Sequence, residues 1–146
     1  MWLIGIITFV TASVLSLGGT WLMRAVAPRL GLIDHPAARK VHTVPKPLGG
    51  GIAIWAAFVL TVGLAYLAAA AVNAGWVGSP KWFPESVHIH LPGMFSRASQ
   101  VGLILGLATI VMLMGLADDR RGLSYVLRLG IEMVLVFVLI GQDVRL

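Results

Sequence analysis

Long apolar blocks separated by polar links make up most of the sequence. Three blocks hold about twenty or more residues with few or no charges, and a fourth is shorter. A helix of about twenty residues, rising about 1.5 Å per residue, crosses the roughly 30 Å hydrocarbon core of a bilayer. The blocks cover residues 1–23, 48–72, 98–117 and 126–141. The pattern predicts an all-α fold: a polytopic transmembrane helical bundle of about four spans, forming one domain over residues 1–146.

Composition supports a membrane protein. The chain is 58% hydrophobic and 12% charged, with a mean hydropathy of +0.92, whereas soluble domains are about half apolar and a quarter charged. It has no cysteine, which excludes disulfides and thiolate ligands. The net charge of +5 would suggest nucleic acid in a soluble protein. Here the basic residues lie between apolar blocks, so membrane topology explains them and we expect no nucleic-acid partner.

The distribution of Lys and Arg predicts the orientation of the spans. Segment 24–46 holds five basic residues against one acid, and Arg120 and Arg121 follow the third block. Segment 73–97 holds only Lys81 and Arg97. By the positive-inside rule the first and third links are cytoplasmic, and the second link and the N-terminus lie outside. No basic residue precedes the first block, which favours an uncleaved span over a secretory signal peptide.

The first cytoplasmic link is basic and ends in three glycines, residues 49–51. Arg39, Lys40, His42 and Lys46 supply cationic or titratable groups, and the glycines let backbone approach a ligand or another helix. A phosphate-rich substrate needs such groups to offset its charge. The same cations would also enforce topology and bind anionic lipid headgroups. This link alone does not decide between the two interpretations.

Two adjacent aspartates, Asp118 and Asp119, lie where the third block ends. Neighbouring carboxylates at a low-dielectric boundary repel one another and are costly to desolvate. Bound Mg²⁺ (or Mn²⁺) would offset both costs, because it takes hard oxygen ligands and commonly bridges to substrate phosphates. Alternatively, one carboxylate binds metal and the other accepts a proton. The simplest alternative is a helix end in water at which Arg120 and Arg121 neutralise the pair.

The fourth block carries two ionisable residues, Arg128 and Glu132. They are four residues apart, so on a helix they can pair on one face. Ionisable groups within a span usually face the interior of the bundle. We interpret the pair as structural, or as support for the nearby aspartates.

The two cytoplasmic stretches also carry a family resemblance. They contain Asp34-x-Pro36, Arg39-Lys40-Val41-His42-Thr43, Pro45-x-Pro47, Gly49-Gly50 and Gly115-x-x-Asp118-Asp119-Arg120. Together they resemble the polyprenyl-phosphate N-acetylhexosamine-1-phosphate transferase family (glycosyl transferase family 4), which includes the phospho-MurNAc-pentapeptide transferases. The resemblance covers nearly the whole chain, including the separation of the two stretches by two spans.

The resemblance implies a Mg²⁺-dependent enzyme of the bacterial cytoplasmic (inner) membrane. It would transfer N-acetylhexosamine 1-phosphate from a UDP-N-acetylamino sugar, such as UDP-GlcNAc, to polyprenyl (undecaprenyl) phosphate, releasing UMP. This is the first membrane step of cell-envelope glycan synthesis. By resemblance, Asp118 would deprotonate or orient the lipid phosphate and Asp119 would bind or position the metal, although which aspartate does which stays open. Lys40 and His42 would face phosphates, with Arg39 and Lys46 as further candidates.

Two features depart from the family pattern. A third aspartate often follows the acidic pair by three residues, and that position is Gly122 here. Family members also have many more spans, so the resemblance implies the N-terminal portion of a longer transferase that inserts into the membrane but does not transfer sugar phosphate alone. Two alternatives come from other classes: a small membrane transporter subunit using the aspartates as an ion site, and a non-catalytic membrane assembly protein. A homodimer is one assembly open to the chain.

Overall fold

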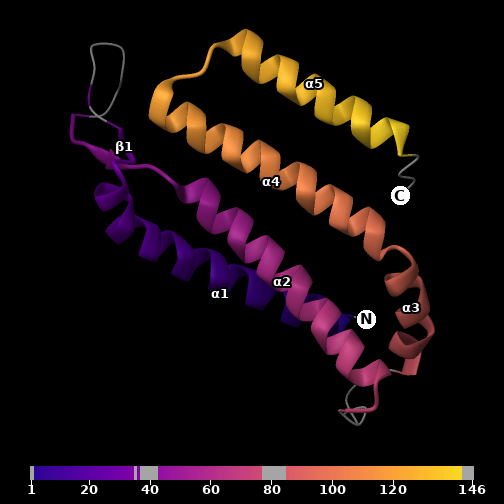
Figure 1. Ribbon diagram of the computed structural model, residues 1–146. Coiled ribbons are helices and arrows are strands. Elements are labelled where there is room, and N and C mark those ends of the chain that lie inside the picture. The colour runs from indigo at the N-terminus through magenta and orange to yellow at the C-terminus, as the bar shows by residue number, and fades with distance from the viewer. Residues whose placement is uncertain (1, 35, 37–42, 77–84, 143–146) are drawn as a thin grey trace.

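Five α-helices make up most of the part of the chain that the structure describes. The computed structural model describes residues 2–34, 36, 43–76 and 85–142 (Figure 1). The long helices lie side by side in the order α1, α2, α4, α5, and each contacts the next. Their bounds are α1 Trp2–Val26, α2 Gly50–Asn73, α3 Glu85–Ser96, α4 Ala98–Arg121 and α5 Tyr125–Gly141. The prediction of an all-α membrane bundle is confirmed.

Three of these helices are long and apolar enough to cross a membrane. They are α1 extended through Leu30, α2 and α4, with 29, 24 and 24 residues. The fourth predicted span coincides with α5, which has 17 residues and is shorter than the other three. At about 1.5 Å per residue α5 extends over roughly 25 Å. A crossing by α5 stays a prediction.

Small side chains on α2 allow α1 to pack closely against it. Ala53, Ala57 and Thr61 are buried and recur every fourth residue, so they share one face of α2. On α1, a Cβ built at Gly19 would lie 3.2 Å from the Cβ of Ala53. The Thr61 hydroxyl donates to the carbonyl of Ala57 at 2.7 Å, so this buried donor is satisfied within α2. In lipid such close backbone approach replaces the hydrophobic effect as the source of helix association.

A short antiparallel pairing closes the first link. After the 3₁₀ helix η1 (Ala27–Leu30), strand β1 (Ile33–Asp34) pairs with β2 (Lys46–Pro47). Leu32, which is 1% exposed, anchors the base of this hairpin. Its amide donates to Ala27 and its carbonyl accepts from Leu48. The two ends of the link are therefore held together where α2 begins.

The predicted outer link contains a helix, α3, that the sequence pattern did not indicate. The hydroxyl of Tyr66 on α2 donates to the carbonyl of Met94 at 3.1 Å, and its ring meets that of Phe95 edge-on, with centroids 6.3 Å apart. These contacts fix α3 against the far end of α2, away from the hairpin (Figure 1).

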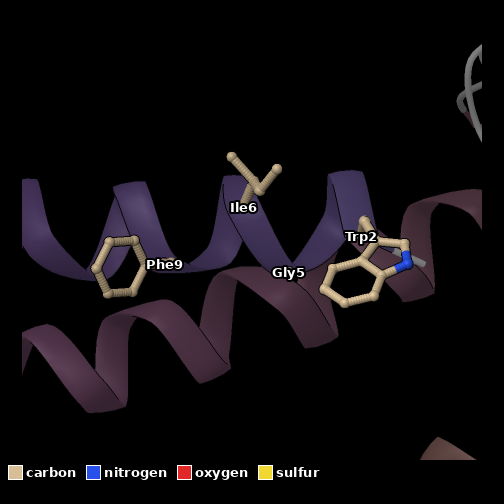
Figure 2. A pocket seen from close by; sticks show the side chains of 4 residues that line it. All are labelled: Trp2, Gly5, Ile6 and Phe9. Carbon is tan, nitrogen blue, oxygen red and sulfur yellow. The ribbon is translucent and has the colours of Figure 1, made fainter.

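Much of the helix surface is apolar and exposed, as lipid-facing surface would be. Near the start of α1, Trp2, Ile6 and Phe9 project around Gly5 and leave a hollow of about 390 Å³ (Figure 2). Trp2 is 90% exposed. In the part of the chain that the structure describes, the interior consists mainly of the α1–α2 contact and the base of the hairpin.

Candidate functional site

The acidic pair and the glycine-rich start of α2 lie at the same end of the bundle. Gly49 and Gly51 line one hollow with Asp118 and Asp119, which belong to the last turn of α4. The hollow has a volume of about 470 Å³. Two stretches separated by two long helices in the sequence therefore meet, and the base of the first link lies beside them (Figure 1).

We call this hollow the α2–α4 groove. It has a polar mouth, formed by the glycines and aspartates, and apolar walls that follow both helices away from the mouth. The wall residues are Ile52, Ile54, Trp55 and Phe58 on α2, and Ala108, Val111, Met112, Gly115 and Leu116 on α4. The indole of Trp55 donates to the hydroxyl of Thr109 at 3.2 Å and ties the walls together. The groove therefore offers a long apolar surface that ends at two carboxylates.

Gly49 determines how the chain enters the groove. Its φ of 96° is left-handed, and a Cβ there would lie 2.7 Å from the end of the Met23 side chain. Only glycine adopts this conformation at low cost. The turn at Gly49 starts α2 against α1, and Gly49 and Gly51 line the groove mouth where the helix begins.

Asp118 is held by contacts to both of its oxygens. Its Oδ1 accepts the amide of Leu123 at 2.7 Å, and its Oδ2 accepts from Nη1 of Arg128 at 2.8 Å. The side chain of Asp118 is 26% exposed and that of Arg128 is 43% exposed. Gly122, with a φ of 63°, turns the chain so that its amide caps the carbonyl of Asp118. The carboxylate thus joins the end of α4 to the start of α5.

Asp119 differs from its neighbour. It is exposed at the groove mouth, and among the described residues its carboxylate has no hydrogen bond or ion pair. The alternative in which Arg120 and Arg121 neutralise the aspartates is wrong for Asp118, whose cationic partner is Arg128. Arg120 instead reaches the end of η1, where its Nη2 donates to the carbonyl of Leu30 at 3.4 Å.

The interpretation of Arg128 and Glu132 as a mutual pair is wrong, because Arg128 pairs across the turn with Asp118. The second interpretation, that Arg128 supports the aspartates, agrees with this contact. Gly122 reverses the chain between α4 and α5 and brings the first turn of α5 over the end of α4. Glu132 lies one turn further along α5 and is exposed.

The predicted phosphate-binding cations are only partly placed. Arg39, Lys40 and His42 lie outside the described residues. Lys46 is exposed on β2, in register with Asp34 of β1. Within the described ranges, Lys46 makes no ion pair with Asp118 or Asp119. Its role at the site stays a prediction.

The acidic mouth of the groove suits a metal that is completed by substrate. Among the residues that the structure describes, no three His, Cys, Asp or Glu side chains gather into a metal cluster. Mg²⁺ commonly uses one or two carboxylates together with waters and substrate phosphates. Asp119 offers free hard oxygens at an open mouth, which fits that mode better than a closed protein cage.

The groove walls were missed in the sequence. Trp55, Phe58 and Met112 sit in uniformly apolar stretches, where groove-facing and lipid-facing residues look alike. Thr109, a polar residue within an apolar span, was the one available signal for this wall.

Two named bacterial proteins are similar to nearly the whole chain. One is decaprenyl-phosphate N-acetylglucosaminephosphotransferase of Mycobacterium tuberculosis, 29% identical over 136 residues, which cover 92% of this chain and 28% of the relative. The other is the probable undecaprenyl-phosphate N-acetylglucosaminyl 1-phosphate transferase of Bacillus subtilis, 24% identical over 142 residues, covering 94% and 32%. No family model and no solved structure matches the chain. The chain spans about a third of the length of these relatives. The likeness agrees with the motifs around the groove: over nearly its whole length the chain is similar to the N-acetylglucosamine-phosphate transferases named here.

Proposed function

We propose that the protein takes part in transferring N-acetylglucosamine 1-phosphate from UDP-N-acetylglucosamine to a polyprenyl phosphate, with release of UMP. One observation carries this proposal: the α2–α4 groove combines a long apolar wall with two carboxylates at its mouth. A polyprenyl phosphate has the matching shape, an apolar chain that ends in a phosphate. Both relatives bear names that include a polyprenyl phosphate and an N-acetylglucosamine-phosphate group.

The reaction joins two anions. An oxygen of the lipid phosphate forms a bond to the β-phosphorus of the sugar nucleotide, and the bond from that phosphorus to the bridging oxygen breaks, so that UMP leaves. Bound Mg²⁺ (or Mn²⁺) would supply positive charge that stabilises the transferring phosphoryl group. Asp119, with Asp118 beside it, would hold the metal at the groove mouth. Arg39, Lys40, His42 and Lys46 are the candidates for binding phosphate oxygens.

The walls of the groove would hold the prenyl chain and orient its phosphate. Trp55 and Phe58 on one side and Val111 and Met112 on the other present apolar side chains along the two helices. Burying the chain against them fixes the direction from which the phosphate reaches the acidic mouth. Such positioning lowers the entropic part of the reaction barrier.

Transfer should depend on Asp119. In membranes of cells that produce the protein from its natural gene, Asp119→Asn should lower UMP release by roughly a hundred- to a thousandfold, as is typical when an essential electrostatic contact is lost. Glu132→Gln is the matched control, since it also removes an exposed carboxylate but lies on α5. Equal activity of the two variants, or product formation without any divalent cation, would refute the assignment.

We further infer that the groove mouth faces the cytoplasm and that the N-terminus lies outside. The Lys and Arg excess near the mouth supports this orientation. Single cysteines are informative because the chain has none. A thiol introduced at the exposed Thr43 should react only from the cytoplasmic side, and one at the exposed Ser99 only from outside. The reverse labelling would contradict this orientation.

Nothing comparable supports the transporter or assembly alternatives, since both relatives are named as transferases. A homodimer stays a prediction.

A further inference from the structure

Asp118 and Arg128 each occupy the unfavourable end of their own helix. Asp118 lies in the last turn of α4, where the helix dipole disfavours a negative charge. Arg128 lies in the first turns of α5, where the dipole disfavours a positive charge. Local helix electrostatics therefore stabilises neither residue in its place. Their ion pair, with 2.8 Å between Nη1 and Oδ2, offsets both penalties.

The surrounding turn is built to maintain this pair. Gly122 supplies the left-handed residue that ends α4, and Leu123 donates its amide to the second oxygen of Asp118. Ser124 then caps α5 by accepting the amide of Leu127 at 3.3 Å. The direction of α5, and with it the position of Arg128, is set by consecutive residues of one short turn.

A carboxylate with both oxygens already engaged is poorly placed for a second task. Oδ1 holds a backbone amide that ends the helix, and Oδ2 holds a guanidinium. Each oxygen keeps a second lone pair, but turning the carboxylate towards a metal or a proton would strain the two contacts that hold the turn. Asp119 has no such contacts within the described part of the chain, and both residues line the same groove.

We propose that Asp118 is a positioning carboxylate, locked by Arg128 and the Leu123 amide, and that Asp119 alone of the pair contacts metal and substrate phosphate. Arg128 acts through Asp118: their ion pair fixes the last turn of α4 and so fixes where Asp119 points. This assignment rests on the proposed function, and it answers the question of roles that the sequence left open.

The assignment can be separated from a direct role of Asp118 by rescue. Asp118→Asn keeps an acceptor for the Leu123 amide, but its new NH₂ group faces the guanidinium of Arg128, donor against donor. Arg128→Gln removes that cation. The double variant D118N/R128Q should therefore be more active than D118N, by roughly three- to tenfold, as coupled neighbours commonly are.

The dependence on metal gives a second measure. In D118N and in R128Q, Mg²⁺ should be needed at a several-fold higher concentration for half-maximal activity, because the turn that directs Asp119 is loosened. Arg128→Lys, which keeps the positive charge, should need less Mg²⁺ than R128Q. As the matched control, D119N/R128Q should be no more active than D119N. A double variant D118N/R128Q no better than D118N would overturn the proposal, because it would show that the charge of Asp118 itself is needed.

A readout independent of activity distinguishes this inference from the proposed function. The experiment compares SDS unfolding, in detergent micelles, of the unaltered protein with that of D118N, R128Q and D118N/R128Q. The losses in free energy of unfolding caused by the two single changes should not add. The double variant should unfold at an SDS content close to that of the less stable single variant. Strict additivity would overturn the inference even if transfer is observed. Absence of transfer by the unaltered protein, produced from its natural gene, would refute the proposed function and leave this coupling measurable.

Discussion

Replacing Gly49 with alanine tests whether the groove mouth depends on one left-handed residue. The residue is buried at the start of α2 with a φ of 96°. An alanine in the left-handed region costs about 1–2 kcal/mol. Its Cβ would also lie 2.7 Å from Cε of Met23. That Met23 atom is the end of a flexible side chain, so displacing it adds the lower part of the overpacking range, about 1 kcal/mol. Gly49→Ala should therefore lower the free energy of unfolding by about 2–3 kcal/mol.

Gly50→Ala is the matched control. A Cβ at Gly50 meets nothing within 4 Å, and its φ is not left-handed. Alanine there should be neutral, or stabilising by up to about 1 kcal/mol, because it lowers the entropy of the unfolded chain. The free energy of unfolding of both variants can be measured by SDS titration in mixed micelles. If Gly49→Ala were as stable as Gly50→Ala, the turn at Gly49 would not constrain the start of α2.

Other substitutions test the packing that positions the site. Gly19→Leu should separate α1 from α2, because even a Cβ at Gly19 lies 3.2 Å from the Cβ of Ala53. Gly18→Leu should be tolerated, because a Cβ there meets nothing within 4 Å. Cross-linking between α1 and α2 would distinguish the two variants. Trp55→Phe removes the hydrogen bond to Thr109 and should lower the free energy of unfolding by about 0.6 kcal/mol, the usual value for such bonds in membranes. Gly122→Ala should cost about 1–2 kcal/mol for its left-handed φ, and Gly122→Asn less, when both are compared by SDS unfolding.

Helix positions followed from the sequence because lipid imposes a simple rule. A bilayer accepts helices whose backbone groups are bonded internally, and the apolar blocks have the required lengths. The predicted range 98–117 corresponds to α4, Ala98–Arg121, which continues past the apolar block through both aspartates. Hydropathy marks where the apolar residues end, whereas the helix itself ends at the left-handed Gly122.

The pairing of Asp118 with Arg128 was not predictable from periodicity. Spacing within one helix suggested Glu132 as the partner of Arg128, because a four-residue separation is visible in the sequence. The real partner lies ten residues earlier, across a turn whose geometry depends on Gly122 and Ser124. The same glycine occupies the place where related motifs often carry a third aspartate. Its φ of 63° costs glycine least, while an aspartate tolerates it less readily.

The short length of α5 has a consequence for the lipid around it. With 17 residues against 24 in α4, α5 is about 10 Å shorter at about 1.5 Å per residue. The Asp118–Arg128 contact fixes the first turn of α5 beside the end of α4, so the difference in helix length lies entirely at the Gly141 end of α5. A bilayer of ordinary thickness must thin locally at that end, or α5 must stop within it. Hydrophobic mismatch of this kind costs fractions of a kcal/mol for each ångström. Bilayers of shorter acyl chains should therefore stabilise the α4–α5 hairpin, and the thickness of the surrounding membrane becomes a factor in how firmly the acidic mouth of the groove is held.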